Sequence, residues 1–192
     1  MEVQELELPG VKKITPKRFT DERGFFQETW NSLTFRKNVC AVDFVQDNHS
    51  CSAQAGTIRG LHFQREPFAQ GKLIRVIHGS IFDVVVDVRP DYNTFGKHLT
   101  MTLDAISGVQ LWVPIGFLHG FCTLEPDTEV LYKVTNYYSR EHDGGVVWND
   151  PDLKISWPVK PQNAVLSEKD KHLPRWRDLS LKLAPLWYRS GF

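Results

Sequence analysis

Short apolar runs with a period of two dominate the hydrophobic pattern of this chain. In 81–90 the even positions are apolar, while Asp83, Val85 and Asp87 occupy the alternate positions. Side chains alternate between the two faces of a strand, so this period predicts β-structure. Comparable runs predict further strands at 11–16, 25–30, 43–50, 57–64, 73–80, 98–103, 109–113, 117–124 and 129–136.

Turn residues separate these runs at short intervals. Gly79-Ser80 lies between two β-branched runs, and we interpret it as the turn of a tight hairpin. Many short strands divided by Gly, Pro and Asp are typical of an all-β sandwich or jelly roll. The helical signals are few: a short helix at 31–39 begun by Asn31-Ser32, and a helix start at 167–170.

The chain of 192 residues is long enough for one sizeable core, so we expect a single domain over 1–192. After Asp143 the alternation weakens, and prolines punctuate what we interpret as an extended C-terminal tail. The final stretch, 181–192, is aromatic, and we expect it to pack on the body or on a second subunit.

Charge and cysteine content narrow the class of protein. The chain has 23 basic and 23 acidic residues, so no basic field predicts binding to nucleic acid or to an anionic membrane. Three widely spaced cysteines fit free thiols in a reducing compartment. The acidic N-terminus has no long apolar core, and no run is long enough to span a bilayer. We therefore expect a cytoplasmic protein.

Two acids within an apolar strand are the first unusual feature. Asp83 and Asp87 lie on a face that the surrounding valines predict to be buried. A buried charge is costly unless a partner compensates it. The sequence therefore predicts a polar partner for each carboxylate.

The segment Arg59-Gly60-Leu61-His62-Phe63-Gln64 is the first candidate for chemistry. Strict alternation would place Arg59 on the face opposite to His62, although Gly60 leaves room for a bulge that would change the facing. A histidine within an apolar run is often a core residue held by one hydrogen bond. Lys72, ten residues later, would add a cation near the same place.

A second candidate segment is Pro114-Ile115-Gly116-Phe117-Leu118-His119, and its Pro-x-Gly-x-x-His pattern resembles the second motif of the cupin superfamily. In metal-binding cupins this histidine is a ligand, together with a His-x-His pair and a glutamate from the first motif. Here Gln64 replaces the second histidine of that pair, and Lys72 follows where an acid would be expected. Because an ammonium opposes a bound cation, we expect no metal.

Over most of its length the chain resembles the dTDP-4-dehydrorhamnose 3,5-epimerases, nucleotide-sugar epimerases of the cupin superfamily. The resemblance implies a cupin-type jelly-roll barrel with a few short peripheral helices. The matching segments, in order, are 21–26, 46–50, 59–64, 70–72, 82–87, 114–121, 132–138 and 167–170.

Inversion next to a ketone needs a base on one face of the ring, an acid on the other, and a group that stabilises the enolate. The resemblance assigns the base to His62 with Asp170 behind it, and the acid to Tyr132. Lys72 is the natural cation for the oxyanion. No redox cofactor is needed, and the chain has no glycine-rich dinucleotide loop. Taken alone, Tyr132 is an ordinary strand aromatic and Asp170 a surface acid.

The resemblance also implies a set of substrate-binding residues. Cations are expected at the pyrophosphate of a dTDP-4-keto-6-deoxyhexose. Tyr138 is expected either to stack on the thymine or to line the sugar pocket. The implied assembly is a homodimer that exchanges N-terminal strands. The implied binding residues are Arg23, Glu28, Gln46, Asn48, Arg59, Lys72, His119, Tyr138, Asp143 and Lys169.

Three alternatives stay open at this point. A 3-epimerase of a related deoxysugar pathway would have the same catalytic residues. A cupin that only binds a sugar nucleotide would not need the set of His62, Tyr132 and Asp170. A metal-dependent cupin is disfavoured by Gln64 and Lys72.

Overall fold

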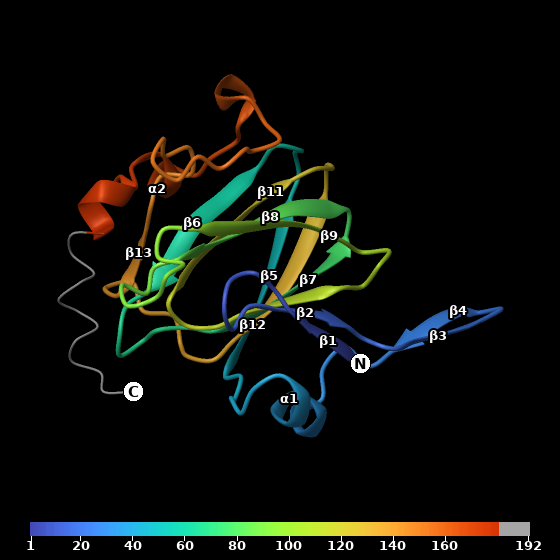
Figure 1. The fold of residues 1–192 in the computed structure, drawn as a ribbon. Helices are drawn as coiled ribbons and strands as arrows, with labels where there is room; N and C mark the ends of the chain where they lie inside the picture. The colour runs from blue at the N-terminus through green and yellow to red at the C-terminus, as the bar shows by residue number, and fades with distance from the viewer. Residues whose placement is uncertain (181–192) are drawn as a thin grey trace.

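The computed structural model describes residues 1–180 and consists of two large antiparallel sheets, a hairpin and short helices (Figure 1). The six-stranded sheet has the order β1 (Glu2–Glu5), β2 (Lys12–Thr15), β10 (Gln110–Val113), β7 (Lys72–His78), β12 (Thr128–Val134) and β5 (Gln46–Ser52). The five-stranded sheet has the order β13 (Asp143–Gly145), β6 (Ile58–Gln64), β11 (Phe117–Thr123), β8 (Ser80–Asp87) and β9 (His98–Asp104). The remaining elements are β3 (Arg18–Asp21), β4 (Gly24–Gln27), α1 (Ser32–Asn38), the 3₁₀ helix at Pro161–Asn163 and α2 (Glu168–Lys171).

The main core lies between the two sheets. Ile74 and Val76 of β7 meet Val85 of β8 and Phe121 of β11, and each of these side chains is at least 95% buried. This arrangement follows from the period-two pattern, because each sheet can bury its apolar face only against the other. The alternation-based prediction of facing β-sheets is therefore confirmed.

The outer faces of the sheets are covered by different parts of the chain. On the six-stranded sheet, Phe35 and Val39 at α1 pack on Leu73 and Trp112. The side chain of Asn31 caps α1 by accepting a hydrogen bond from the Thr34 backbone N–H, as the sequence predicted. On the five-stranded sheet, the segment after β13 packs through Val146, Trp148, Leu153 and Trp157.

The predicted hairpin at Gly79 is wrong. β7 pairs with β10 and β12, whereas β8 pairs with β9 and β11 in the other sheet. Gly79 has a φ of +72°, and a Cβ there would lie 2.4 Å from the Thr128 hydroxyl oxygen. The glycine therefore makes a corner that carries the chain between sheets. A corner and a hairpin both favour glycine with positive φ, so the local sequence does not separate them.

Other predicted boundaries moved by a few residues. The strand expected at 43–50 runs instead from Gln46 to Ser52, because it pairs with β12 over that whole length. The expected helix start at 167–170 is confirmed, since Ser167 caps α2. The aromatic stretch 181–192 lies outside the described residues.

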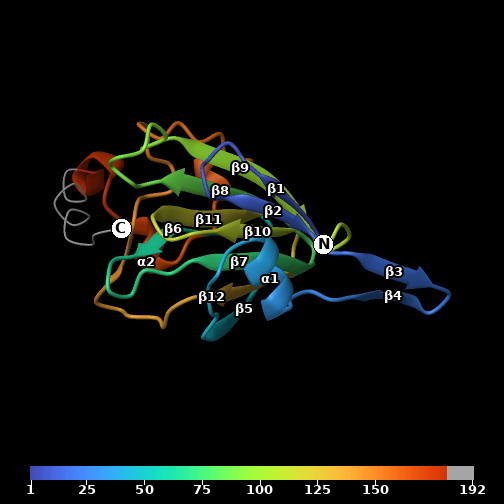
Figure 2. The same ribbon diagram turned by 60° about the horizontal axis from the view of Figure 1, so that its bottom comes forward.

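The β3–β4 hairpin projects from the body of the protein (Figures 1 and 2). Its aromatic side chains are exposed, with Phe25 at 61% and Phe26 at 70% of their maximal accessible area. Large exposed aromatics that gather on one element indicate an interaction surface. In residues 1–180 no helix is long and apolar enough to cross a membrane.

Candidate functional site

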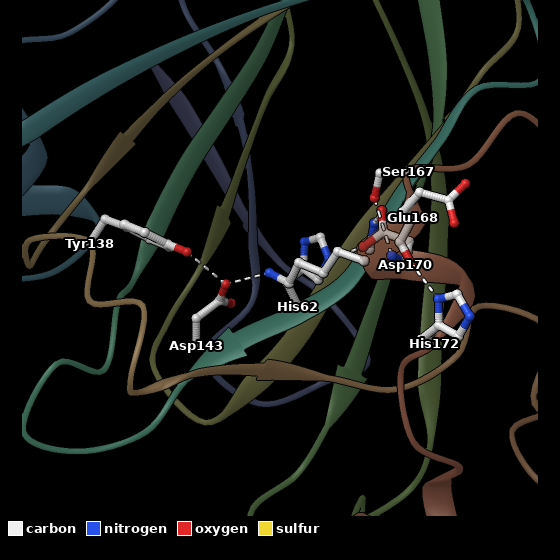
Figure 3. Close-up of polar contacts among 9 residues, drawn as sticks. His62, Tyr138, Asp143, Ser167, Glu168, Asp170 and His172 are labelled. Atoms are coloured by element: carbon white, nitrogen blue, oxygen red, sulfur yellow. Dashed lines mark hydrogen bonds and ion pairs between the residues drawn. The ribbon is translucent and has the colours of Figure 1, made fainter.

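His62 and Asp170 form a close pair at the inner face of the five-stranded sheet. The imidazole Nε2 lies 2.5 Å from Asp170 Oδ1, and the Asp170 residue is 3% exposed. Ser167 holds α2 at this place by accepting the backbone N–H of Asp170 (Figure 3). Burial disfavours the Asp170 carboxylate, but hydrogen bonds and the charge of His62 outweigh it, and the pKa of Asp170 is lowered. The expected proximity of these two residues is confirmed.

A bulge in β6 brings Arg59 to the same cavity as His62. His62 pairs with His119, and Arg59 pairs with Phe121. The two β6 residues are three positions apart in sequence, whereas their β11 partners are only two positions apart. The extra residue reverses the facing, so Arg59 and His62 both line the cavity, and strict alternation gave the wrong face for Arg59.

The bulge requires glycine on both strands. Gly60 has a φ of +124°, and a Cβ there would lie 2.6 Å from the Cα of Gly120. Residues of β5, an edge strand of the six-stranded sheet, then hold the Arg59 side chain in place. Its guanidinium donates hydrogen bonds to the Ser52 hydroxyl at 3.1 Å and to the Cys51 carbonyl at 3.0 Å.

Lys72 and Tyr132 approach the cavity from the six-stranded sheet. They lie on neighbouring strands β7 and β12, opposite His62. Burial lowers the pKa of Lys72 to about 8, although Asp143 and Asp83 partly restore it. Burial raises the pKa of Tyr132 above its ordinary value, so the phenol keeps its proton at neutral pH.

The cavity has an inner and an outer part. The inner part, about 90 Å³, is lined by residues of both sheets, and the outer part measures about 170 Å³. His62, Lys72 and Tyr132 line both parts and so stand where the two meet. The other polar residues of the inner part are Ser50, Arg59 and His119, and those of the outer part are Gln46, Asn48, Gln64, Gln70, Tyr138, Asp143 and Lys169.

Asp143 organises the outer part of the cavity. Its carboxylate accepts a hydrogen bond from the Tyr138 hydroxyl at 3.1 Å (Figure 3). The same carboxylate pairs with the ammonium of Lys169. On the facing sheet, the Gln46 side chain donates to Asn48 Oδ1 at 2.9 Å and accepts the Tyr138 backbone N–H. These five residues surround the mouth of one cavity, where the sequence predicted substrate contacts.

Arg23 and Glu28 are not brought to the cavity of their own chain. Arg23 lies in the turn of the projecting hairpin, where its guanidinium pairs with Asp21 and its side chain is 83% exposed. Glu28 accepts a hydrogen bond from Asn31 in front of α1. Both residues therefore lie outside the described site.

The buried acids of β8 have the partners that the sequence required. Asp87 accepts hydrogen bonds from Arg89 and from the Thr94 hydroxyl. Asp83 Oδ2 lies 2.9 Å from Nε2 of His119, and both residues are buried. The pattern identified Asp83 as buried and charged, but it gave no indication that His119 would be the partner.

Gln64 has a structural role that the motif alone did not reveal. Its side-chain amide donates to the carbonyls of Phe68 and Tyr137, and its Oε1 accepts the Ser139 backbone N–H. The amide thus joins two loops at the rim of the cavity. Within residues 1–180 no three His, Cys, Asp or Glu side chains are grouped closely enough to hold a metal ion.

The sequence was also compared with known proteins. A family model described as dTDP-4-dehydrorhamnose 3,5-epimerase matches residues 5–178. A dTDP-4-dehydrorhamnose 3,5-epimerase of Sinorhizobium fredii is 55% identical over 174 residues, which cover 91% of this chain and 89% of the relative. This chain belongs to the dTDP-4-dehydrorhamnose 3,5-epimerase family.

Solved structures agree with this family and its fold. The epimerase of Bacillus anthracis, with TDP and PPi bound, is 49% identical, with a TM-score of 0.86 over 91% of this chain and 99% of its own. The 3,5-epimerase of Legionella pneumophila, in complex with dTDP-4-keto-L-rhamnose, is 37% identical, with a TM-score of 0.89 over 95% and 96%. The predicted cupin-type jelly roll is therefore confirmed for this epimerase-family chain.

A more distant relative has a different reaction in its name. A 3'-monoepimerase of Streptomyces bikiniensis, in complex with dTDP-quinovose, is 28% identical, with a TM-score of 0.87 over 96% of this chain and 94% of its own. The fold is thus common to the double and single epimerases.

Proposed function

We propose that this chain converts dTDP-4-dehydro-6-deoxy-D-glucose to dTDP-4-dehydro-L-rhamnose by inversion at C3 and C5. The observation that carries the proposal is the placement of the His62–Asp170 pair across one cavity from Tyr132 and Lys72. The higher identity to 3,5-epimerases than to the 3'-monoepimerase favours the double reaction.

His62 is the proposed base. Because Nε2 is engaged by Asp170, Nδ1 is the nitrogen left to remove a proton from C3 or C5. Asp170 fixes the orientation of the ring and stabilises the imidazolium that forms, as in other carboxylate–histidine pairs. Asp170 thus acts through His62 as a positioning residue.

Loss of the proton leaves negative charge on the C4 oxygen. The ammonium of Lys72 is the proposed partner for that enolate, and its burial strengthens the interaction because water competes less. Tyr132 lies on the same sheet as Lys72 and faces His62 across the cavity. It is the proposed acid that returns a proton to the other face of the carbon. The reaction moves only protons, so its chemistry needs neither a redox cofactor nor a metal.

The nucleoside is proposed to occupy the outer part of the cavity, with the pyrophosphate reaching Arg59 in the inner part. Arg59 supplies a cation for the pyrophosphate, and Gln46 and Asn48 supply amides for the nucleoside. Tyr138, Asp143 and Lys169 surround the mouth. In relatives of this family, TDP or a dTDP-sugar has been found bound.

The proposed assembly is a homodimer in which the β3–β4 hairpin reaches the partner. The hairpin exposes Phe25 and Phe26 and carries Arg23 away from its own cavity. Exposed aromatics and an arginine at the end of an arm are suited to contact a second copy and its nucleotide. Arg23 and Glu28 would then complete the partner's site.

Proton NMR of the candidate substrate in deuterated water tests this function. We expect solvent deuterium at both C3 and C5, with formation of the L-rhamno product. Exchange and inversion at C3 alone would favour the single-site alternative. Binding of dTDP without exchange at either carbon would identify a sugar-nucleotide-binding protein and overturn the proposal.

A further inference from the structure

Two carboxylate–histidine pairs stand side by side in this protein. His62 of β6 and His119 of β11 are direct cross-strand partners, and both line the inner part of the cavity. Each imidazole presents Nε2 to a buried carboxylate, at 2.5 Å for Asp170 and 2.9 Å for Asp83. The proposed chemistry uses only the first pair.

Asp83 fixes how His119 can interact with a ligand. With the Asp83 carboxylate as the acceptor of this contact, Nε2 of His119 carries the hydrogen. Nδ1 is the ring nitrogen that remains to bind a molecule in the cavity. Asp83 is 1% exposed and does not line the cavity, so towards a ligand it acts as a positioning residue through His119, while its charge also supports the ammonium of Lys72.

Ser50 provides a second polar group at the same place. It lies on β5 of the facing sheet and lines the inner part of the cavity. Its hydroxyl is buried and has no hydrogen-bond partner among the described residues. A buried hydroxyl without a partner is costly, and a ligand hydroxyl could both donate to and accept from it.

We propose that the inner end of the cavity binds the C2 hydroxyl of the hexose through His119 and Ser50, with Asp83 positioning His119. This inference rests on the proposed function. His119 lies beside the proposed base His62, which places it at the sugar ring. In the substrate, C2 carries the only ring hydroxyl on a carbon that does not invert. Contacts to it can hold the ring through both inversions.

The test compares the dTDP-4-keto-6-deoxyhexose with its 2-deoxy analogue by kcat/KM. The parent protein is expected to disfavour the analogue by at least about tenfold, because its hydroxyl-binding groups are left unpaired. Asp83→Asn is expected to lose about tenfold or more on the parent substrate, and less than about threefold on the analogue. Ser50→Ala is expected to show the same asymmetry to a smaller extent.

Asp87→Asn is the matched control. Asp87 is a buried acid of the same strand, but it bonds Arg89 and Thr94 instead of a cavity residue. This variant is expected to lower stability and to leave the ratio of the two kcat/KM values unchanged. Thermal unfolding of all variants checks that each is folded at the assay temperature.

Three outcomes are informative against the idea. Equal losses on both substrates in Asp83→Asn would mean that Asp83 does not act through the C2 hydroxyl, whether it is structural or supports the charge of Lys72, and would overturn the inference. If Asp83→Asn weakened the binding of dTDP that carries no sugar, His119 would be placed at the nucleotide, and this result would also overturn the inference. If the parent protein does not epimerise the keto sugar at all, the proposed function itself fails, and this result is distinct from the other two.

Discussion

His62 and Asp170 are 108 residues apart in the chain, and yet their side chains meet at 2.5 Å. The contact requires α2 to fold back over β6, where the Gly60 backbone N–H also points at the Asp170 carboxylate. The pair is thus assembled from two distant segments. Because the pKa of Asp170 is lowered, its carboxylate stays ionised beside the imidazole of His62 in a largely buried site.

Replacement of His62 tests the proposed base. His62→Ala is expected to lower the rate of deuterium entry at C3 by about 10²–10⁴-fold, the usual contribution of a positioned general base. Asp170→Asn keeps the imidazole but mis-orients it, so a smaller loss is expected. NMR in deuterated water measures both rates, and calorimetric titration with dTDP checks that the nucleotide still binds. Exchange near the parent rate in His62→Ala would assign the base to another residue.

Tyr132→Phe separates acid from base. The change deletes one hydroxyl and keeps the packing of the ring, so the fold is expected to survive. With His62 and Lys72 intact, deuterium is expected to enter C3 with little inversion, because His62 exchanges the abstracted proton with solvent and delivers a deuteron to the original face. NMR of the sugar and a coupled reductase assay measure the two events. Equal loss of exchange and inversion would instead make Tyr132 a positioning residue.

The charge of Lys72 is expected to limit activity at alkaline pH. Its pKa of about 8 lies below the ordinary lysine value, so the ammonium predominates at pH 7 and falls to about a tenth at pH 9. The value of kcat/KM should therefore decline as pH rises through about 8. The raised pKa of Tyr132 places loss of the phenol proton at higher pH.

Lys72→Arg provides the control for that profile. A guanidinium keeps its charge at pH 9, so this variant is expected to be slower but to lose the decline near pH 8. A profile of unchanged shape in Lys72→Arg would show that another group sets the alkaline limit.

Mixed dimers test whether the hairpin completes the partner's site. Arg23→Ala and His62→Ala are each expected to have little activity when pure. If Arg23 acts in the partner, each mixed dimer has one intact site, and random mixing should restore about a quarter of the parent activity. The mass of the assembly should be twice 22.1 kDa. No restoration in dimers that demonstrably exchange subunits would place Arg23 in its own site or outside catalysis.

Gly60→Ala tests the bulge that turns Arg59 to the cavity. The added Cβ would lie 2.6 Å from the Gly120 Cα at a φ of +124°, so a stability loss of about 2 kcal/mol or more is expected. Gly24 has the same φ, but a Cβ there would meet nothing within 4 Å in its own chain beyond its two neighbours, and Gly24→Ala therefore reports mainly the effect of φ. Urea unfolding measures both, and equal losses would argue against the steric contribution of Gly120.

The sequence by itself determined most of the strands, although not β1, β3 and β13, together with the helix caps and the burial of the acids in β8. These features depend on side-chain periodicity and on local hydrogen bonds, as at Asn31 and Ser167, which act over a few residues. The resemblance to known epimerases added the identity of the candidate site residues. Most of these lie around one cavity, although Arg23 and Glu28 do not.

Only the tertiary structure decided how these pieces combine. The corner at Gly79 sends β7 and β8 to different sheets, and the bulge beside Gly60 places Arg59 with His62. The partnership of Asp83 with His119 depends on the register between β8 and β11. Each of these features is set by which strands lie side by side. That choice is made by packing between residues far apart in the chain, so a local pattern of polar and apolar positions does not contain it.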